Sequence, residues 1–241
     1  MRKKTLLLLL VAVFLMLVGV ALFLFPIFTT STNIPSVTYT AKSKFQQIEI
    51  DLEKTDFSVC SAEETYIEIS GYRESEYYIS EENGKLLLTD CSEKSPLLFK
   101  LSGLGKYAKE ILQPTDQKKV ILHLSNEDSH KPLNIILQNS NLTLSASVDY
   151  LTINAAHSSI ISDNMTFDRF SGRLTDCDSM FSILYPANEF SRNIETHATK
   201  LSLNGDERAN TEQYTPNFQK PYFILETHGG ICRLTYPQNT P

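Results

Sequence analysis

A ladder of short apolar clusters between Leu133 and Asn204 constrains the fold more than any other feature of the sequence. Most clusters are about nine to eleven residues apart, with groups of Asn, Asp, Ser, Thr or Gly between them. Several have the form apolar–polar–apolar, as in LTL, LTI and LSL, so alternate side chains face one interior. Strands this short cannot bury their apolar faces alone, whereas stacked copies can. The ladder therefore predicts an all-β domain built as a β-solenoid. Its clusters are Leu133/Ile135, Leu142/Leu144, Leu151/Ile153, Ile160/Ile161, Leu174, Ile183/Leu184, Ile194 and Leu201/Leu203.

Strand patterns also occur on both sides of the ladder. In residues 45–59, Ile48, Ile50 and Leu52 alternate with acidic residues, which is typical of a half-buried strand. Asn83-Gly84 predicts a two-residue hairpin, because both residues tolerate the positive φ of a type I′ turn. Gly229-Gly230 is expected to join a last pair of strands. The strands expected outside the ladder lie at 45–59, 66–71, 77–90, 119–124, 223–227 and 231–236.

Two polar segments interrupt the strand pattern, at 92–118 and 207–220. The first contains apolar residues at helical spacing before Pro114, which predicts a short amphipathic helix. It is interpreted as a surface excursion, with a lid or a partner-docking element as the alternative. The second is expected to be a polar excursion.

The N-terminus has a different character from the rest of the chain. Leu6–Phe28 contains 23 residues without a charged or amide side chain. A helix of that length rises roughly 34 Å, enough for a hydrocarbon core of about 30 Å. The run is longer than the apolar core of a cleaved signal peptide, about 7–15 residues. Residues 1–28 are therefore expected to form a cytoplasmic tip and an uncleaved transmembrane signal anchor, with cleavage near Thr29–Ser31 as the alternative.

The charge pattern predicts the orientation of the chain. Arg2, Lys3 and Lys4 precede the apolar run, and no Lys or Arg follows until Lys42. The positive-inside rule then places the N-terminus in the cytoplasm and the C-terminal domain outside a single-pass cell membrane anchor. Residues 29–44, rich in Ser and Thr, are expected to be a tether to the domain at 45–241.

The chain carries 22 Lys and Arg against 28 Asp and Glu, which argues against nucleic-acid binding.

The four cysteines follow no CxxC or zinc-knuckle spacing. Outside a membrane they can form two disulfides with three possible connectivities, or they can pack in strands as free thiols. The sequence leaves both states open for Cys60, Cys91, Cys177 and Cys232.

The pattern resembles the bacterial DUF4097 "putative adhesin" family. The resemblance rests on FQQIEIDLEKTDFSV at 45–59, YYISEENGKLLLTD at 77–90, KVILHL, the LTL/LTI/LSL rungs and the terminal FILETHGGICRLTY. These segments span nearly all of residues 40–236. The resemblance implies a β-helix-like domain behind an N-terminal membrane helix and a role in the cell envelope. Segment 92–118 has no counterpart in it.

The sequence contains no catalytic constellation. The five histidines form neither H-x-x-x-H nor H-E-x-x-H, so a metal site would have to be assembled by the fold. Asp176 and Asp178 provide two carboxylates where calcium takes six to eight oxygen ligands, so they are interpreted as a solvated turn. We expect no catalytic, cofactor-binding or metal-binding residues, no cofactor and no enzyme activity. The histidines are His123, His130, His157, His197 and His228, and the other charged ladder residues considered are Asp149, Asp163, Asp168, Arg169, Arg173 and Arg192.

Four tyrosines close together in the first hairpins, Tyr66, Tyr72, Tyr77 and Tyr78, are interpreted as cross-strand pairs or an end cover. Sugar stacking or anchoring of a protein partner is the alternative.

The expected function is a non-catalytic, membrane-anchored cell-envelope protein that acts as an interaction, sensing or adhesion scaffold with an envelope protein partner. The alternative is a β-helix protein that binds or processes cell-wall glycan. A glycan site predicts a carboxylate or Arg cluster on one face and a groove lined by aromatic residues.

Overall fold

The computed structural model describes residues 35–41, 44–91, 117–208, 211–214 and 221–238, together with Met16. The expected anchor, apart from Met16, and nearly all of the 92–118 excursion lie outside these residues. Within the described part of the chain, no helix combines the length and apolar character needed to cross a membrane. The described strands belong to one compact unit, formed by residues 35–94 and 117–241.

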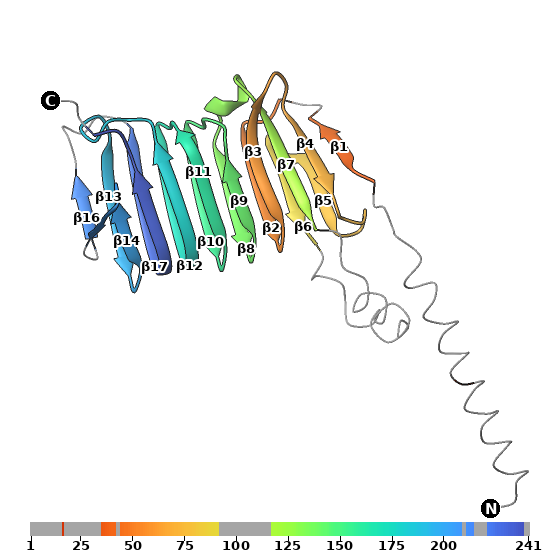
Figure 1. The fold of residues 1–241 in the computed structure, drawn as a ribbon. Helices are drawn as coiled ribbons and strands as arrows, with labels where there is room; N and C mark the ends of the chain where they lie inside the picture. Colours follow the sequence, from red (N-terminus) through yellow and green to blue (C-terminus); the bar gives the residue numbers. More distant parts are fainter. Residues whose placement is uncertain are drawn as a thin grey trace, which may run out of the picture. The chain divides into compact units, whose positions relative to one another are not determined.

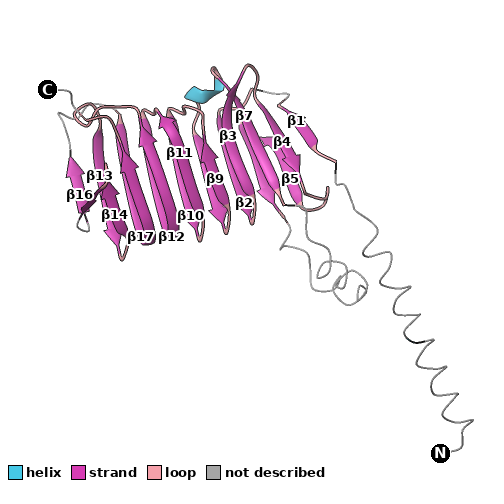
Figure 2. Cartoon of the chain, viewed as in Figure 1, coloured by secondary structure: helices cyan, strands magenta, loops and turns pink. Residues whose placement is uncertain are grey.

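Between residues 35 and 238 the described secondary structure consists of 17 strands and one short 3-10 turn, η2 (Asp128–His130) (Figure 2). This confirms the prediction of an all-β fold for that part of the chain. The strands belong to one continuous 17-stranded sheet (Figure 1). Its pairings form two ladders, which β12 and β17 join because each of these long strands runs through both.

The first ladder has parallel pairing throughout its interior and one antiparallel strand at each end. In spatial order its strands are β5 (Tyr77–Glu82), β6 (Lys85–Asp90), β2 (Gln47–Glu53), β8 (Leu133–Gln138), β10 (Tyr150–Ala156), the first half of β12 (Arg169–Ile183), the first half of β17 (Tyr222–Thr235), β13 (Ser191–His197) and β16 (Thr211–Tyr214).

The second ladder follows the same plan, with antiparallel strands at its ends. Its strands are β1 (Val37–Thr40), β4 (Tyr66–Ser70), β7 (Lys119–Ser125), β3 (Asp56–Ala62), β9 (Asn141–Leu144), β11 (Ser159–Met165), the second halves of β12 and β17, β14 (Lys200–Leu203) and β15 (Asp206–Arg208). The chain bends from the first ladder into the second after β2, β8, β10 and β13, and within β12 and β17. It returns to the first ladder after β4, β7, β9, β11, β12 and β15.

Aromatic rings join the two ladders across one core. Phe170 lies in the first half of β12 and Phe181 in the second half, yet their ring centroids are 5.2 Å apart. The Phe223 ring, from β17, stacks on Phe170 at 4.4 Å. Because each strand alternates its side chains, only one of each adjacent apolar pair faces this core. Ile160 is buried, whereas its neighbour Ile161 is 39% exposed.

The bends between the ladders share a two-residue pattern. The first residue of each bend has a positive φ, as Asn, Asp and Gly tolerate best. These residues are Lys54, Asn139, His157, Asp176, Ala198 and Gly229. In five of the bends the second residue carries a hydroxyl or thiol that donates to the carbonyl oxygen two residues earlier. These second residues are Thr55, Ser140, Ser158, Cys177 and Thr199.

The bend hydroxyls also connect neighbouring turns of the chain. Ser158 Oγ accepts the backbone N–H of Ser140, and Ser140 Oγ accepts that of Thr55, each at 3.1 Å. Each buried hydroxyl therefore satisfies a backbone donor that would otherwise have no partner at the bend.

Ser158→Ala is expected to lower the free energy of unfolding by about 1–3 kcal/mol, because it leaves the buried N–H of Ser140 without its acceptor. Chemical denaturation of the full chain in detergent measures the loss. Ser159→Ala is the matched control, since it removes the neighbouring hydroxyl and keeps the bend intact. Equal losses for the two variants would contradict the structural role of the bend hydroxyl.

The Asn83-Gly84 hairpin is confirmed, since β5 and β6 pair antiparallel and both turn residues have positive φ. Two predicted segments contain more strand than expected. Val37–Thr40 of the expected tether forms β1, because its β-branched residues pair with β4. Strand β16 lies within the expected 207–220 excursion and β15 extends into it, and they pair with β13 and β14, respectively.

The last strand of the chain occupies an interior position. β17 pairs with β12 on one side and with β13 and β14 on the other (Figure 1). Gly229-Gly230 does not form a hairpin there. Both glycines have positive φ and lie where β17 passes from the first ladder to the second.

Candidate functional site

A groove of about 510 Å³ crosses the outer face of the first ladder, from β6 and β2 to β12. Its lining combines carboxylates, amides, one guanidinium and aliphatic side chains. The lining residues are Asp51, Leu52, Glu53, Asp90, Ile136, Leu137, Gln138, Asn154, Ala155, Ala156, Arg173 and Thr175.

Strand register places the groove residues in straight rows. Asp51 pairs with Ile136, Ile136 with Asn154, and Asn154 with Arg173. Parallel neighbours lie about 4.8 Å apart, so the row from Asp51 to Arg173 spans roughly 14 Å. The groove therefore offers an extended ligand an acidic end, a central Ile–Asn floor and a basic end.

At the acidic end of the groove, contacts with Lys118 and Tyr72 hold the side chain of Asp90 in place. The Asp90 side chain is 3% exposed, and its Oδ2 lies 3.3 Å from Lys118 Nζ. The Tyr72 hydroxyl donates to the same carboxylate at 3.2 Å, and Lys118 Nζ lies 4.6 Å from the centre of the Tyr72 ring. Burial raises the pKa of the Tyr72 hydroxyl above its usual value. Asp51 and Glu53 line the same end of the groove, and Lys54 Nζ lies 3.2 Å from Glu53 Oε1. Three carboxylates therefore face two ammonium groups, those of Lys54 and Lys118, and this end of the groove remains acidic.

The basic end is formed by Arg173. Its Nη2 and Nε lie 2.9 and 3.0 Å from Glu226 Oε2 on β17. The interaction of the Glu226 carboxylate with His228, followed by that with Arg173, holds the pKa of this carboxyl below its usual value. The Arg173 side chain is 69% exposed, so its guanidinium can still be reached by a ligand.

None of the four tyrosines is among the described residues that line the groove, although the Tyr72 hydroxyl donates to Asp90. Tyr72 is buried and packs edge-on against Tyr77, with ring centroids 6.0 Å apart. Tyr66 stacks on His123 at 4.0 Å, and Tyr78 is 47% exposed. None of the described residues that line the groove is aromatic. Packing therefore accounts for Tyr66, Tyr72 and Tyr77.

All four cysteines are free thiols. Cys60 Sγ lies 3.4 Å from His123 Nδ1, and His123 Nε2 lies 3.5 Å from Glu68 Oε2. Burial raises the pKa of the Cys60 thiol, and the charge of Glu68 raises it further. A nucleophilic cysteine needs a lowered pKa, so this Cys–His–Glu row does not support thiol catalysis. Burial likewise raises the pKa of Cys232 to about 11.

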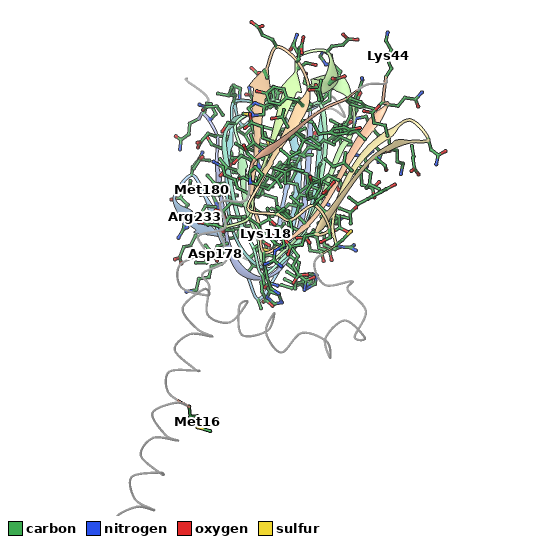
Figure 3. The ribbon with its side chains drawn as sticks, turned by 90° about the vertical axis from the view of Figure 1, so that its right-hand side faces the viewer. Met16, Lys44, Lys118, Asp178, Met180 and Arg233 are labelled. Carbon is green, nitrogen blue, oxygen red and sulfur yellow. The ribbon has the colours of Figure 1, made fainter. Side chains whose placement is uncertain are left out.

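The remaining charged candidates are dispersed. Asp149 lies 2.7 Å from His130, and Asp176 lies at a bend, 3.8 Å from His157. Arg192 is buried against the rings of Phe190 and Tyr236. On the second ladder, Asp178 and Met180 of β12 lie near Arg233 of β17 (Figure 3). Of the charged ladder residues considered in the sequence and not assigned to a site, Arg173 is the one found among the described residues that line the groove.

Sequence reasoning missed Asp51, Glu53, Ile136 and Asn154 as groove residues. Asp51 and Glu53 are the polar positions of the 45–59 alternation, so their outward direction is visible in the sequence. Ile136 lies beside them on the neighbouring strand β8 but is more than 80 residues away in the sequence. No local sequence pattern shows that β2 and β8 pair.

No protein-family model matches the sequence, and no curated protein does. A solved structure with a similar fold is that of a putative cell adhesion protein from Clostridium sporogenes. It is 11% identical, with a TM-score of 0.51, and the match covers 86% of this chain and all of that one. A putative lipid binding protein from Parabacteroides distasonis matches at 12% identity and a TM-score of 0.40, over 84% of this chain and 97% of that one. A putative adhesin from Bacteroides fragilis matches at 9% identity and a TM-score of 0.31, over 86% and 98%. The match to the Clostridium sporogenes protein shows that this chain shares the fold of that structure.

Proposed function

We propose that the chain is a non-catalytic cell-envelope protein, anchored in the membrane by residues 6–28, that presents a DUF4097-like β-solenoid outside the cell. The apolar N-terminal run with its basic tip supports the anchor and its orientation. The parallel in-register pairing supports the solenoid, because each turn of the chain adds one strand to each ladder. The fold shared with a putative cell adhesion protein is consistent with a role in interaction.

The observation that carries the proposal is the groove on the first ladder. Its acidic end attracts a basic side chain, and Asn154 and Gln138 offer both donors and acceptors to an extended backbone. Ile136 lies in its floor and is 40% exposed, which gives an apolar contact. We assign the groove to an extended segment of an envelope protein partner that carries a Lys or Arg opposite Asp51 and Glu53.

Cell-wall glycan is the second candidate. The carboxylates and Arg173 in one groove are the charged cluster expected of a glycan site. The aromatic lining expected of such a site is missing from the described groove residues, and aromatic rings provide much of the contact with sugar faces. A protein segment therefore fits the groove better than a glycan does.

Ile136→Glu is expected to abolish capture of the protein partner by chemical crosslinking of the full chain in its own cells, because it places a charge on the groove floor. Ile161→Glu is the matched control. Ile161 is 39% exposed on the outer face of the second ladder, so this change should leave capture intact. Asp51→Asn is expected to weaken capture more at low salt than at elevated salt, because elevated salt already screens the charge of Asp51 in the unmodified chain.

Wall fractions tested in parallel separate the two candidates. If the chain is retained saturably on wall glycan and Ile136→Glu abolishes that retention, the groove binds a glycan and not a protein segment. Equal capture by the Ile136 and Ile161 variants would exclude the groove as the interaction site.

A further inference from the structure

The tripeptide Glu-Thr-His occurs twice in the chain, at 195–197 in β13 and at 226–228 in β17. These strands are parallel neighbours, and their register pairs Glu195 with Glu226 and His197 with His228. The threonines between them, Thr196 and Thr227, are both buried. Because side chains alternate along a strand, both glutamates and both histidines project from the outer face of the first ladder.

The four polar side chains form a compact group. The imidazoles of His197 and His228 are stacked, with ring centroids 4.5 Å apart and planes 13° from parallel. His197 Nε2 lies 3.1 Å from Glu195 Oε1, and His228 Nε2 lies 3.0 Å from Glu226 Oε1. The exposed fractions of these side chains range from 36% to 58%, so an ion in solvent can reach them.

We propose that the two Glu-Thr-His copies form a binding site for a divalent transition-metal ion of the zinc class. Imidazole nitrogen and carboxylate oxygen bind zinc at about 2.0–2.2 Å, which separates tetrahedral donors by roughly 3.3 Å. The observed Nε2–Oε1 separations are close to that value. No three such donors among the described residues already surround a common ion position, so binding turns the two exposed imidazoles toward each other.

The surrounding charges favour a cation at this position. Two glutamates lie directly opposite each other on neighbouring strands, an arrangement of like charges that is unfavourable by itself. Arg173 holds Glu226 Oε2, whereas Glu226 Oε1 lies beside His228. Arg173 therefore orients the carboxylate as an outer partner orients a metal ligand. The proposed metal site does not rest on the partner proposed for the groove, although Arg173 belongs to both sites.

Isothermal titration of the full chain in detergent with zinc chloride, in the presence of a phosphine reductant, tests the site. One zinc ion is expected to bind, and His197→Ala or His228→Ala should each weaken binding at least ~10-fold. His130→Ala is the matched control, because His130 is exposed beside a single carboxylate, that of Asp149, and its removal should not change zinc affinity. Thermal unfolding of the metal-free variants checks that each remains folded.

X-ray absorption at the zinc edge adds a second readout. Two imidazole nitrogens and no sulfur are expected around the ion. The proposal is overturned if zinc affinity is unchanged in the His197→Ala/His228→Ala double variant, if saturable binding is absent from the unmodified chain, or if Cys60→Ser abolishes binding and the spectrum shows sulfur ligands.

Discussion

Gly230→Ala is expected to lower the free energy of unfolding by at least ~3 kcal/mol, enough to prevent folding of a marginally stable domain. Gly230 has a φ of 78°, where a β-carbon already costs about 1–2 kcal/mol. A Cβ at this position would also lie 2.0 Å from the backbone oxygen of Cys177 and 2.7 Å from its carbonyl carbon. Cys177 pairs directly with Gly230 between β12 and β17, so relief of the overlap requires these strands to separate.

Gly229→Ala provides the matched control for this position. Its φ of 75° is nearly the same, so the conformational cost is shared by the two variants. The added Cβ would approach Asp176 Oδ1 at 2.2 Å, but that atom ends an exposed side chain that can rotate away. We expect a loss of about 1–2 kcal/mol. Urea denaturation of both variants in detergent, followed by far-UV circular dichroism, compares them, and equal losses would contradict the close strand approach at Gly230.

Phe223→Ala is expected to destabilise the domain by about 3–5 kcal/mol, because it leaves a cavity in the core between the ladders. Phe223 is fully buried, and its ring lies 4.4 Å from Phe170, 5.7 Å from Phe181 and 5.9 Å from Phe167. Phe223→Leu keeps most of the apolar volume and should cost less. The same denaturation measurement reports both losses.

A double-mutant cycle between Phe223 and Phe181 tests whether the two ladders share this core. Phe223 belongs to the first ladder and Phe181 to the second, and their rings meet edge to face. Such pairs couple by about 0.5–1.5 kcal/mol. Strictly additive losses would show that the two rings do not touch in solution.

Most local elements of this fold were predictable from the sequence, because period-two alternation and Asn-Gly turns are local signals. Strands β1, β15 and β16 were not predicted. The order of the strands was not predictable. β2 pairs with β8 and β17 lies between β12 and β13, and both arrangements join segments distant in the chain. Short strands with similar apolar–polar–apolar patterns do not identify their partners, so Gly229-Gly230 resembles a hairpin connection in the sequence.

The bend hydroxyls, the two Glu-Thr-His copies and the groove could not be recognised from the sequence, because each depends on backbone conformation or strand pairing. The Ser and Thr at the bends resemble ordinary loop composition until the positive-φ residue before each one is known. The two Glu-Thr-His copies are a visible repeat, but their significance depends on the register of β13 with β17. Arg173 was considered as a charged candidate, and only strand pairing aligns it with Asn154, Ile136 and Asp51.

Site-specific photocrosslinking in the native cells tests the interaction face most directly. A photoreactive amino acid replaces Ile136 in one full-length variant and Ile161 in another, since the two positions are equally exposed on opposite ladders. We predict an adduct with one envelope protein from position 136 and none from position 161, and loss of that adduct when Asp51 and Glu53 are changed to Asn and Gln. An adduct from position 161 alone, or identical adducts from both positions, would contradict the assignment of the groove as the interaction face.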